Sequence, residues 1–119
     1  MTTNRRTSHI ALGAWGEQKV EQWYQERGYR VLARNWRCKA GELDLVVRKS
    51  RVLVTCEVKT RSSDRFGSPL ESVDPRRVQR LQNATGAYLH AERPKGISVV
   101  RIDLAAVLNG NITVVEAAL

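Results

Sequence analysis

The chain has 119 residues, of which 42% are hydrophobic and 27% are charged, with three prolines and two cysteines. That length accommodates one hydrophobic core and excludes two full domains, and the composition excludes a disordered or fibrous protein. Twenty Lys and Arg residues against twelve Asp and Glu residues leave a formal charge of +8, which favours a polyanionic partner such as nucleic acid.

The cysteines and the N-terminal segment indicate the compartment. Cys38 and Cys56 form no C-x-x-C motif, and no apolar signal sequence follows the first residues, so we expect a cytoplasmic protein with free thiols. No apolar run approaches the ~20 residues needed to cross a bilayer, and no membrane partner is expected. A zinc site that combines the cysteines with His9 and His90 is disfavoured, because these residues lack recognisable ligand spacing.

The hydrophobic pattern divides the chain into seven elements. Residues 1–8 are expected to form a flexible basic tail, followed by a single domain over residues 9–119. In chain order the predicted elements are a helix over residues 10–28, strands over 30–37, 42–47 and 52–59, a helix over 75–93, and strands over 97–104 and 112–115. This order predicts an α/β fold.

Turn and cap residues set the boundaries of several elements. Gly28 is a natural C-terminal stop for the first helix. Asp74 and Pro75 predict the start of the second helix, with the acid as N-cap and the proline at the first helical position. Asn109 and Gly110 predict a hairpin turn before the last strand.

Two carboxylates and a lysine are expected to meet where the second and third strands pair. Glu57 and Lys59 are two residues apart and therefore share one face of their strand. If the hairpin closes through Ser50 and Arg51, or through a four-residue loop in the same register, Asp44 lies directly opposite Glu57. Opposed carboxylates repel each other unless a cation lies between them, and Mg²⁺ prefers oxygen ligands.

Two further features extend this candidate site. Lys59 would place its ammonium beside the metal, where it could orient or help deprotonate an attacking water. Glu17 lies near the edge of the apolar stripe of the first helix and could approach the same cluster. Gly13 and Gly16 would let that helix come close to the sheet. These are the groups that phosphodiester hydrolysis requires.

The same residues also have a simpler interpretation. An acid and a base two residues apart on a strand often form only a solvated ion pair. Asp103 and Glu116 stand at the same separation as Asp44 and Glu57, yet the position equivalent to the lysine is Ala118. The pattern alone therefore leaves open a nuclease and a structural or partner-binding protein with an ion-pair network.

Short motifs along the domain resemble those of one known family. They are Gly13-Ala14-Trp15-Gly16-Glu17, Arg34-Asn35-Trp36-Arg37, Gly41-Glu42-Leu43-Asp44-Leu45, Glu57-Val58-Lys59-Thr60-Arg61, Phe66-Gly67 and Ile102-Asp103. Together and in this order they resemble the YraN family of small predicted endonucleases. The resemblance covers nearly the whole domain, from about His9 to the C-terminus.

The resemblance implies a restriction-endonuclease-like core of the PD-(D/E)xK superfamily, with a mixed central sheet flanked by two main helices. The family is similar to the archaeal type of Holliday junction resolvase, in which an N-terminal helical Glu joins the Asp and Glu-x-Lys set. By that similarity Glu17, Asp44, Glu57 and Lys59 take the catalytic positions, and the three acids hold Mg²⁺ or Mn²⁺. Leu43 stands where the superfamily's name has proline, a residue that supplies no ligand.

The implied activity is hydrolysis of DNA phosphodiester bonds, with branched DNA as the favoured substrate and a homodimer suited to symmetric cutting. The alternative is a non-catalytic nucleic-acid-binding module on the same fold. The candidates for phosphate contacts are Arg34, Arg37, Lys39, Arg61, Arg65, Arg76, Arg77 and Arg80. The aromatic residues whose spacing fits core packing better than base stacking are Trp15, Trp23, Tyr24, Trp36 and Tyr88.

Overall fold

A computed structural model describes residues 5–61 and 74–117. The elements are α1 (Arg5–Glu26), β1 (Arg30–Cys38), β2 (Gly41–Lys49), β3 (Val52–Arg61), α2 (Pro75–Glu92), β4 (Val99–Leu108) and β5 (Asn111–Val115). Their order is the predicted one, and the α/β class is confirmed. Among the described residues, no helix is long and apolar enough to cross a membrane.

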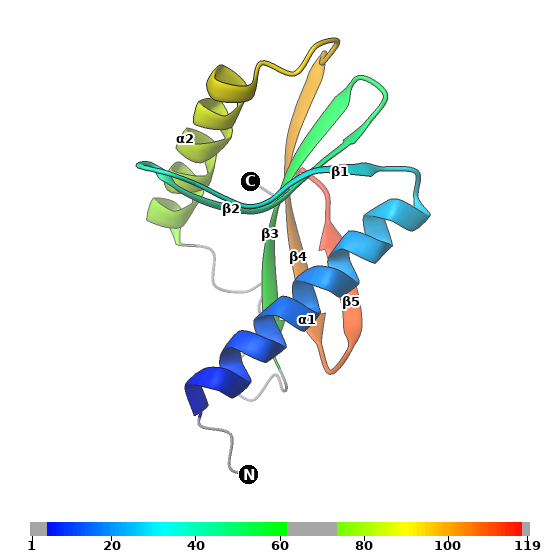
Figure 1. The fold of residues 1–119 in the computed structure, drawn as a ribbon, viewed down its shortest axis with the longest axis vertical. Helices are drawn as coiled ribbons and strands as arrows, with labels where there is room; N and C mark the ends of the chain where they lie inside the picture. The colour runs from blue at the N-terminus through cyan, green and yellow to red at the C-terminus, as the bar shows by residue number, and fades with distance from the viewer. Residues whose placement is uncertain (1–4, 62–73, 118–119) are drawn as a thin grey trace.

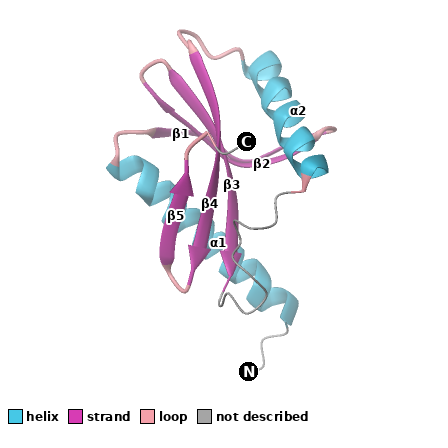
Figure 2. Ribbon diagram, turned by 180° about the vertical axis from the view of Figure 1, so that it is seen from behind, coloured by secondary structure: helices cyan, strands magenta, loops and turns pink. Residues whose placement is uncertain are grey.

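The five strands form one mixed sheet in the order β1-β2-β3-β4-β5 (Figure 1). β1, β2 and β3 form an antiparallel meander, β4 runs parallel to β3, and β5 is antiparallel to β4. The parallel step from β3 to β4 requires a crossover, which contains α2. α1 lies in front of the sheet in Figure 1 and behind it in Figure 2, so the two helices cover opposite faces.

Both hairpin turns occur where the sequence predicted them. The β2–β3 hairpin closes through Ser50 and Arg51, and Ser50 has a φ of 53° although no Gly or Asn is present. The β4–β5 hairpin closes through Asn109 and Gly110, with φ values of 50° and 82°, as a two-residue turn with both central residues left-handed requires. The first turn fixes the register of β2 against β3, and it is the register that the two-residue loop predicted.

The helix ends also follow the cap residues. At the end of α1, Gly28 has a φ of 89°, and its N–H donates to the carbonyl of Gln25. At the start of α2, the side chain of Asp74 accepts from the N–H of Arg76 at 2.9 Å, and Pro75 is the first helical residue. α1 begins at Arg5, earlier than the sequence pattern predicted.

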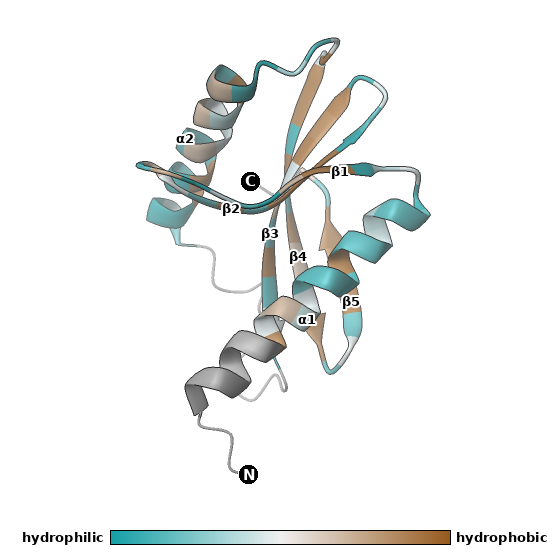
Figure 3. Cartoon of the chain, in the orientation of Figure 1, coloured by the Kyte–Doolittle hydropathy of each residue, from teal (hydrophilic) through white to brown (hydrophobic). Residues whose placement is uncertain are grey.

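Two hydrophobic cores hold the sheet between the helices. On the α1 side the buried residues are Val20, Tyr24, Leu45, Val47, Val54, Cys56, Ala105 and Val107. On the α2 side they are Leu43, Val46, Leu53, Leu81, Ala84 and Tyr88. The central strands are therefore apolar along most of their length, as their colour in Figure 3 shows, while the helices carry many hydrophilic residues. β3 lies at the centre of both cores, which gives its side chains fixed positions.

Four of the five aromatic residues that the sequence assigned to the core lie in it or against it. Tyr24 and Tyr88 are buried, and Trp23 and Trp36 are partly buried against the two cores. The core assignment of Trp15 was wrong, because its side chain is 39% exposed. Each step along a helix rotates the side chain by about 100°, so a residue next to a buried position leaves the buried face.

Candidate active site

The candidate site lies where β2 separates from β3. Pairing between these strands ends at Leu45 and Cys56. Beyond that point the Oδ2 atom of Asp44 accepts a hydrogen bond from the N–H of Val58 at 2.8 Å, so a side chain replaces the backbone partner. Leu43, which strand alternation would place with Leu45, packs against α2 instead. Asp44 thus lies between the parted strands.

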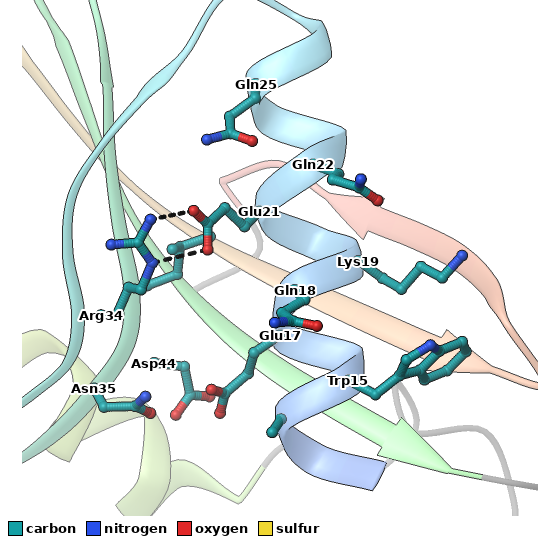
Figure 4. Close-up of a pocket in the computed structure, with 12 residues that line it drawn as sticks. Trp15, Glu17, Gln18, Lys19, Glu21, Gln22, Gln25, Arg34, Asn35 and Asp44 are labelled. Atoms are coloured by element: carbon teal, nitrogen blue, oxygen red, sulfur yellow. Dashed lines mark hydrogen bonds and ion pairs between the residues drawn. The ribbon is translucent and has the colours of Figure 1, made fainter. Parts of the chain in front are cut away.

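Close packing of α1 on β3 brings Glu17 to the same place. A Cβ atom built on Gly16 would lie 1.9 Å from Oγ1 of Thr60, so only glycine permits this approach. The predicted role of Gly16 is confirmed. Among the described residues, nothing lies within 4 Å of such an atom on Gly13, so no close approach there supports its predicted role. Figure 4 shows the carboxylates of Glu17 and Asp44 pointing toward one another. Both residues line a cleft with a volume of about 660 Å³.

Asn35 of β1 lies beside these acids. With its amide nitrogen turned toward them, Asn35 can donate to Oε2 of Glu17 at 3.3 Å and to Oε1 of Glu42 at 3.2 Å. Its φ of 47° departs from extended strand geometry. Sequence reasoning gave Asn35 no role, although it belongs to one of the motifs that carried the family resemblance. Asn35 supplies a neutral donor to a group of negative charges.

The acids perturb one another. Burial raises the pKa of Asp44 to about 6, a backbone hydrogen bond opposes the shift, and the charges of Glu17, Glu57 and Glu42 add to it. Burial also raises the pKa of Glu17; the hydrogen bond from Asn35 lowers it, and the charge of Glu42 raises it. Negative charge is therefore concentrated at one place in a chain whose formal charge is +8. Such a place stabilises a cation.

Glu57 and Lys59 share one face of β3, as predicted. The Glu57 residue is only 6% exposed. Its Oε1 atom accepts from Nε of Arg77 on α2 at 2.5 Å, and Nζ of Lys59 lies 3.7 Å from the same oxygen. Burial lowers the pKa of Lys59, while the charge of Glu57 raises it and that of Arg77 lowers it. From the sequence, Arg77 was predicted to contact nucleic acid, and no sequence signal indicated its pairing with a candidate metal ligand.

The four candidate residues converge only in part. Among the described residues, no three side chains of Asp, Glu, His or Cys gather closely enough to form a ready metal site. Asp44 and Glu17 offer adjacent carboxylate oxygens, the donors that Mg²⁺ and Mn²⁺ prefer. Glu57 would complete the set after it separates from Arg77. The donor set fits a divalent cation, with two acids in place and a third paired to an arginine.

Comparison with known proteins identifies the family of the chain. The model of the family described as "Uncharacterised protein family UPF0102" matches residues 16–107, a span that contains all four candidate site residues. The chain belongs to the UPF0102 family.

Relatives from several bacteria agree with this assignment. A UPF0102 protein of Acidothermus cellulolyticus is 47% identical over 108 residues, covering 83% of this chain and 82% of the relative. A UPF0102 protein of Mycolicibacterium vanbaalenii is 45% identical over 109 residues, covering 92% of this chain and 89% of the relative. These names give the family and no activity, so the endonuclease activity expected from the sequence stays a prediction.

The predicted phosphate-binding residues of this UPF0102 chain have different surroundings. Arg34 donates from Nε to Oε2 of Glu21 at 2.9 Å, so it joins β1 to α1 at the cleft (Figure 4). Arg37 lies 3.5 Å from Oε2 of Glu42. Arg65 lies outside the described residues. Among the described residues, Arg77 is partly buried, and the exposed members of the set are Arg34, Arg37, Lys39, Arg61, Arg76 and Arg80.

Proposed function

We propose that the chain is a metal-dependent nuclease that hydrolyses phosphodiester bonds in DNA. The observation that supports this most is the setting of Asp44, a largely buried carboxyl whose pKa is raised to about 6 beside Glu17. Burial of a charge is costly unless an opposite charge or several hydrogen bonds compensate it. Asp44 receives one backbone hydrogen bond and lies among other acids. A hard cation is the compensation that this arrangement favours.

Each candidate residue has a distinct task in this proposal. Mg²⁺ or Mn²⁺ supplies Lewis acidity toward a phosphoryl oxygen and makes a bound water more acidic. Asp44 and Glu17 would hold the ion, with Glu57 as a further ligand. The N–H of Val58 fixes the Asp44 carboxylate, so this ligand needs little reorganisation. Lys59 can orient the attacking water or offset negative charge on the phosphate.

The fold and substrate complete the proposal. A mixed sheet with an aspartate at the parting of two strands and a Glu-x-Lys on the second strand agrees with a restriction-endonuclease-like core of the PD-(D/E)xK superfamily. The formal charge of +8 favours a polyanionic substrate, and branched DNA is the favoured class. The proposal also comprises a cytoplasmic location and a homodimer, since two identical active sites suit the symmetric cutting of a junction.

The test is cleavage of labelled linear DNA and of a four-way junction, with Mg²⁺, with Mn²⁺ and with chelator. We expect metal-dependent cutting by the wild type and a loss of about 100-fold or more in Asp44→Asn and Lys59→Met, the size of effect seen when one charged catalytic group is removed. Glu116→Gln is the matched control, because Glu116 is an exposed acid that directly follows β5. The preferred substrate separates a general nuclease from a junction resolvase.

One observation favours the second candidate, a nucleic-acid-binding module that does not cut. The carboxylate of Glu57 is already paired with Arg77, so the charge of this acid is compensated without a metal. That module predicts salt-sensitive DNA binding that survives Asp44→Asn, and no cutting under any metal condition. This result would refute the nuclease proposal.

A further inference from the structure

Arg77 contacts the candidate site itself. Both its Nε and a terminal guanidinium nitrogen contact the same oxygen of Glu57, so this oxygen is shared by two donors of one side chain that joins α2 to β3. The Arg77 side chain is 43% exposed, whereas the Glu57 side chain is 7% exposed. The cap at Asp74 and Pro75 begins α2 just before Arg77 and so fixes its position. The guanidinium of Arg77 therefore contacts a buried acid while part of its side chain stays exposed to solvent.

We propose that Arg77 is a positioning residue that exchanges partners during binding. Without nucleic acid it holds Glu57 away from Asp44 and Glu17, and with nucleic acid it pairs with a phosphate and releases Glu57 to the metal. This inference rests on the proposed nuclease function. It explains why Glu57 belongs to the candidate site by sequence while, among the described residues, no three acids lie close enough together to hold a metal ion.

The chemistry of the groups supports the exchange. A buried carboxylate needs a positive partner, so Glu57 must be compensated by Arg77, by Lys59 or by a metal. A guanidinium on Glu57 repels a second cation and occupies one of its oxygens. Arginine can place two N–H groups on the oxygens of a phosphate as it can on those of a carboxylate, and a partly exposed guanidinium is accessible to a phosphate. Metal and nucleic acid therefore assist each other's binding through Arg77.

The first experiment measures Mn²⁺ binding by calorimetry to the full chain without nucleic acid. We compare the wild type with Arg77→Gln and with Arg76→Gln. Arg76 is the neighbouring residue and its side chain is exposed, so Arg76→Gln removes the same charge without touching Glu57. We expect Arg77→Gln to bind Mn²⁺ about tenfold more tightly than the wild type, and Arg76→Gln to change affinity less than about twofold. If Arg77→Gln fails to fold, Arg77→Lys replaces it, with a smaller gain expected because the lysine keeps the positive charge but has one nitrogen where the guanidinium places two on Glu57.

The second experiment tests the phosphate partner. DNA binding is measured at one fixed salt concentration in a Lys59→Met background, which keeps all three acids. With Mn²⁺ present, Arg77→Gln is expected to weaken DNA binding about tenfold, and Arg76→Gln only about twofold; in chelator the two are expected to be equal.

The outcomes separate this inference from the proposed function. Equal Mn²⁺ affinity in the two glutamine variants, or weaker binding in Arg77→Gln, would overturn the exchange. If Asp44→Asn still abolishes Mn²⁺ binding in that case, the proposed metal site is supported and only the partner exchange of Arg77 is refuted. Equal loss of DNA binding with Mn²⁺ would also overturn the exchange. Absence of Mn²⁺ binding in every protein would overturn both the exchange and the metal-dependent nuclease.

Discussion

Asp44 and Asp103 occupy similar positions in the sequence and different environments in the fold. Each lies on a strand, and each precedes a glutamate at the same separation. Asp103 is fully buried, and its oxygens accept from Nε and a terminal nitrogen of Arg101 at 2.8 and 3.0 Å. They also accept from the hydroxyl of Tyr24 at 2.6 Å and from the N–H of Ala117 at 3.0 Å. Every oxygen of Asp103 is compensated.

Asp44 lacks such compensation. Among the described residues it accepts one hydrogen bond, from the N–H of Val58, and its neighbours include three carboxylates. The difference shows that strand position and spacing do not distinguish a structural acid from a candidate ligand. The number of donors around the carboxylate does distinguish them. The oxygens of a structural acid accept hydrogen bonds from the protein, whereas the oxygens of a ligand acid remain available to a metal or substrate.

The largest expected effect concerns Asp103. Asp103→Asn removes the charge that compensates Arg101, whose side chain is only 17% exposed, and breaking a buried pair of this kind costs about 3–5 kcal/mol. Urea unfolding at pH 7 in chelator measures the loss. Asp44→Asn, under the same conditions, is expected to cause no loss. Equal destabilisation by the two substitutions would contradict the contrast between the two acids.

The next effect concerns the pH dependence that Asp44 confers. Its pKa is raised from 3.8 to about 6 in the folded chain, so the folded state binds a proton more readily than the unfolded state. Stability from this residue is therefore full below about pH 4 and is lost as the pH rises through about 6. Above that pH, Asp44→Asn is expected to be more stable than the wild type by up to about 3 kcal/mol.

Urea titrations from pH 4 to pH 8 in chelator test this expectation. The gain in Asp44→Asn should disappear toward pH 4, where the wild-type carboxyl is protonated. Adding Mn²⁺ at pH 7 should stabilise the wild type and leave Asp44→Asn unchanged, because the substitution removes a ligand. A gain that is constant with pH would show that Asp44 does not titrate as its surroundings indicate.

A smaller effect concerns the helix that brings Glu17 to Asp44. In Gly16→Ala the new methyl group would meet the side chain of Thr60, so α1 or Thr60 must shift. Overpacking of this kind costs about 1–3 kcal/mol. Gly13→Ala is the matched control, because no described residue lies within 4 Å of the added Cβ atom, and it is expected to stabilise the helix by about 0.5–1 kcal/mol. In urea unfolding, a lower free energy of unfolding for Gly16→Ala and a higher one for Gly13→Ala would support the close approach of α1 to β3. A higher free energy of unfolding in both variants would contradict it.

Local sequence signals predicted the elements and turns well. Gly28, Asp74-Pro75 and Asn109-Gly110 each act through backbone geometry within a few residues, so their effect is visible in the sequence. The register of β2 against β3 followed from loop length alone. The order of all five strands was not predicted, because the parallel pairing of β3 with β4 depends on contacts between distant residues.

The sequence predicted which residues belong to the candidate site, but it did not predict how they are arranged. Strand alternation placed Glu57 beside Lys59, and the structure confirms this. The separation of β2 from β3 at Asp44 was not predictable, because it occurs where Leu43, near the start of β2, packs toward α2. The pairing of Glu57 with Arg77 joins residues 20 positions apart across a segment with no pattern to relate them. Tertiary contacts therefore decide which acids meet.

The smallest expected effect completes the comparison at Glu116. This glutamate lies 3.6 Å from Arg101, and its side chain is 55% exposed, so solvent screens the pair. An exposed ion pair contributes about 0–1 kcal/mol, and here Arg101 keeps its bonds to Asp103 when Glu116 changes. Glu116→Gln is therefore expected to shift urea unfolding by less than about 0.5 kcal/mol. A loss as large as that of Asp103→Asn would mean that Glu116 and Arg101 form one network with Asp103, and a double-mutant cycle between Glu116 and Arg101 would then measure the coupling.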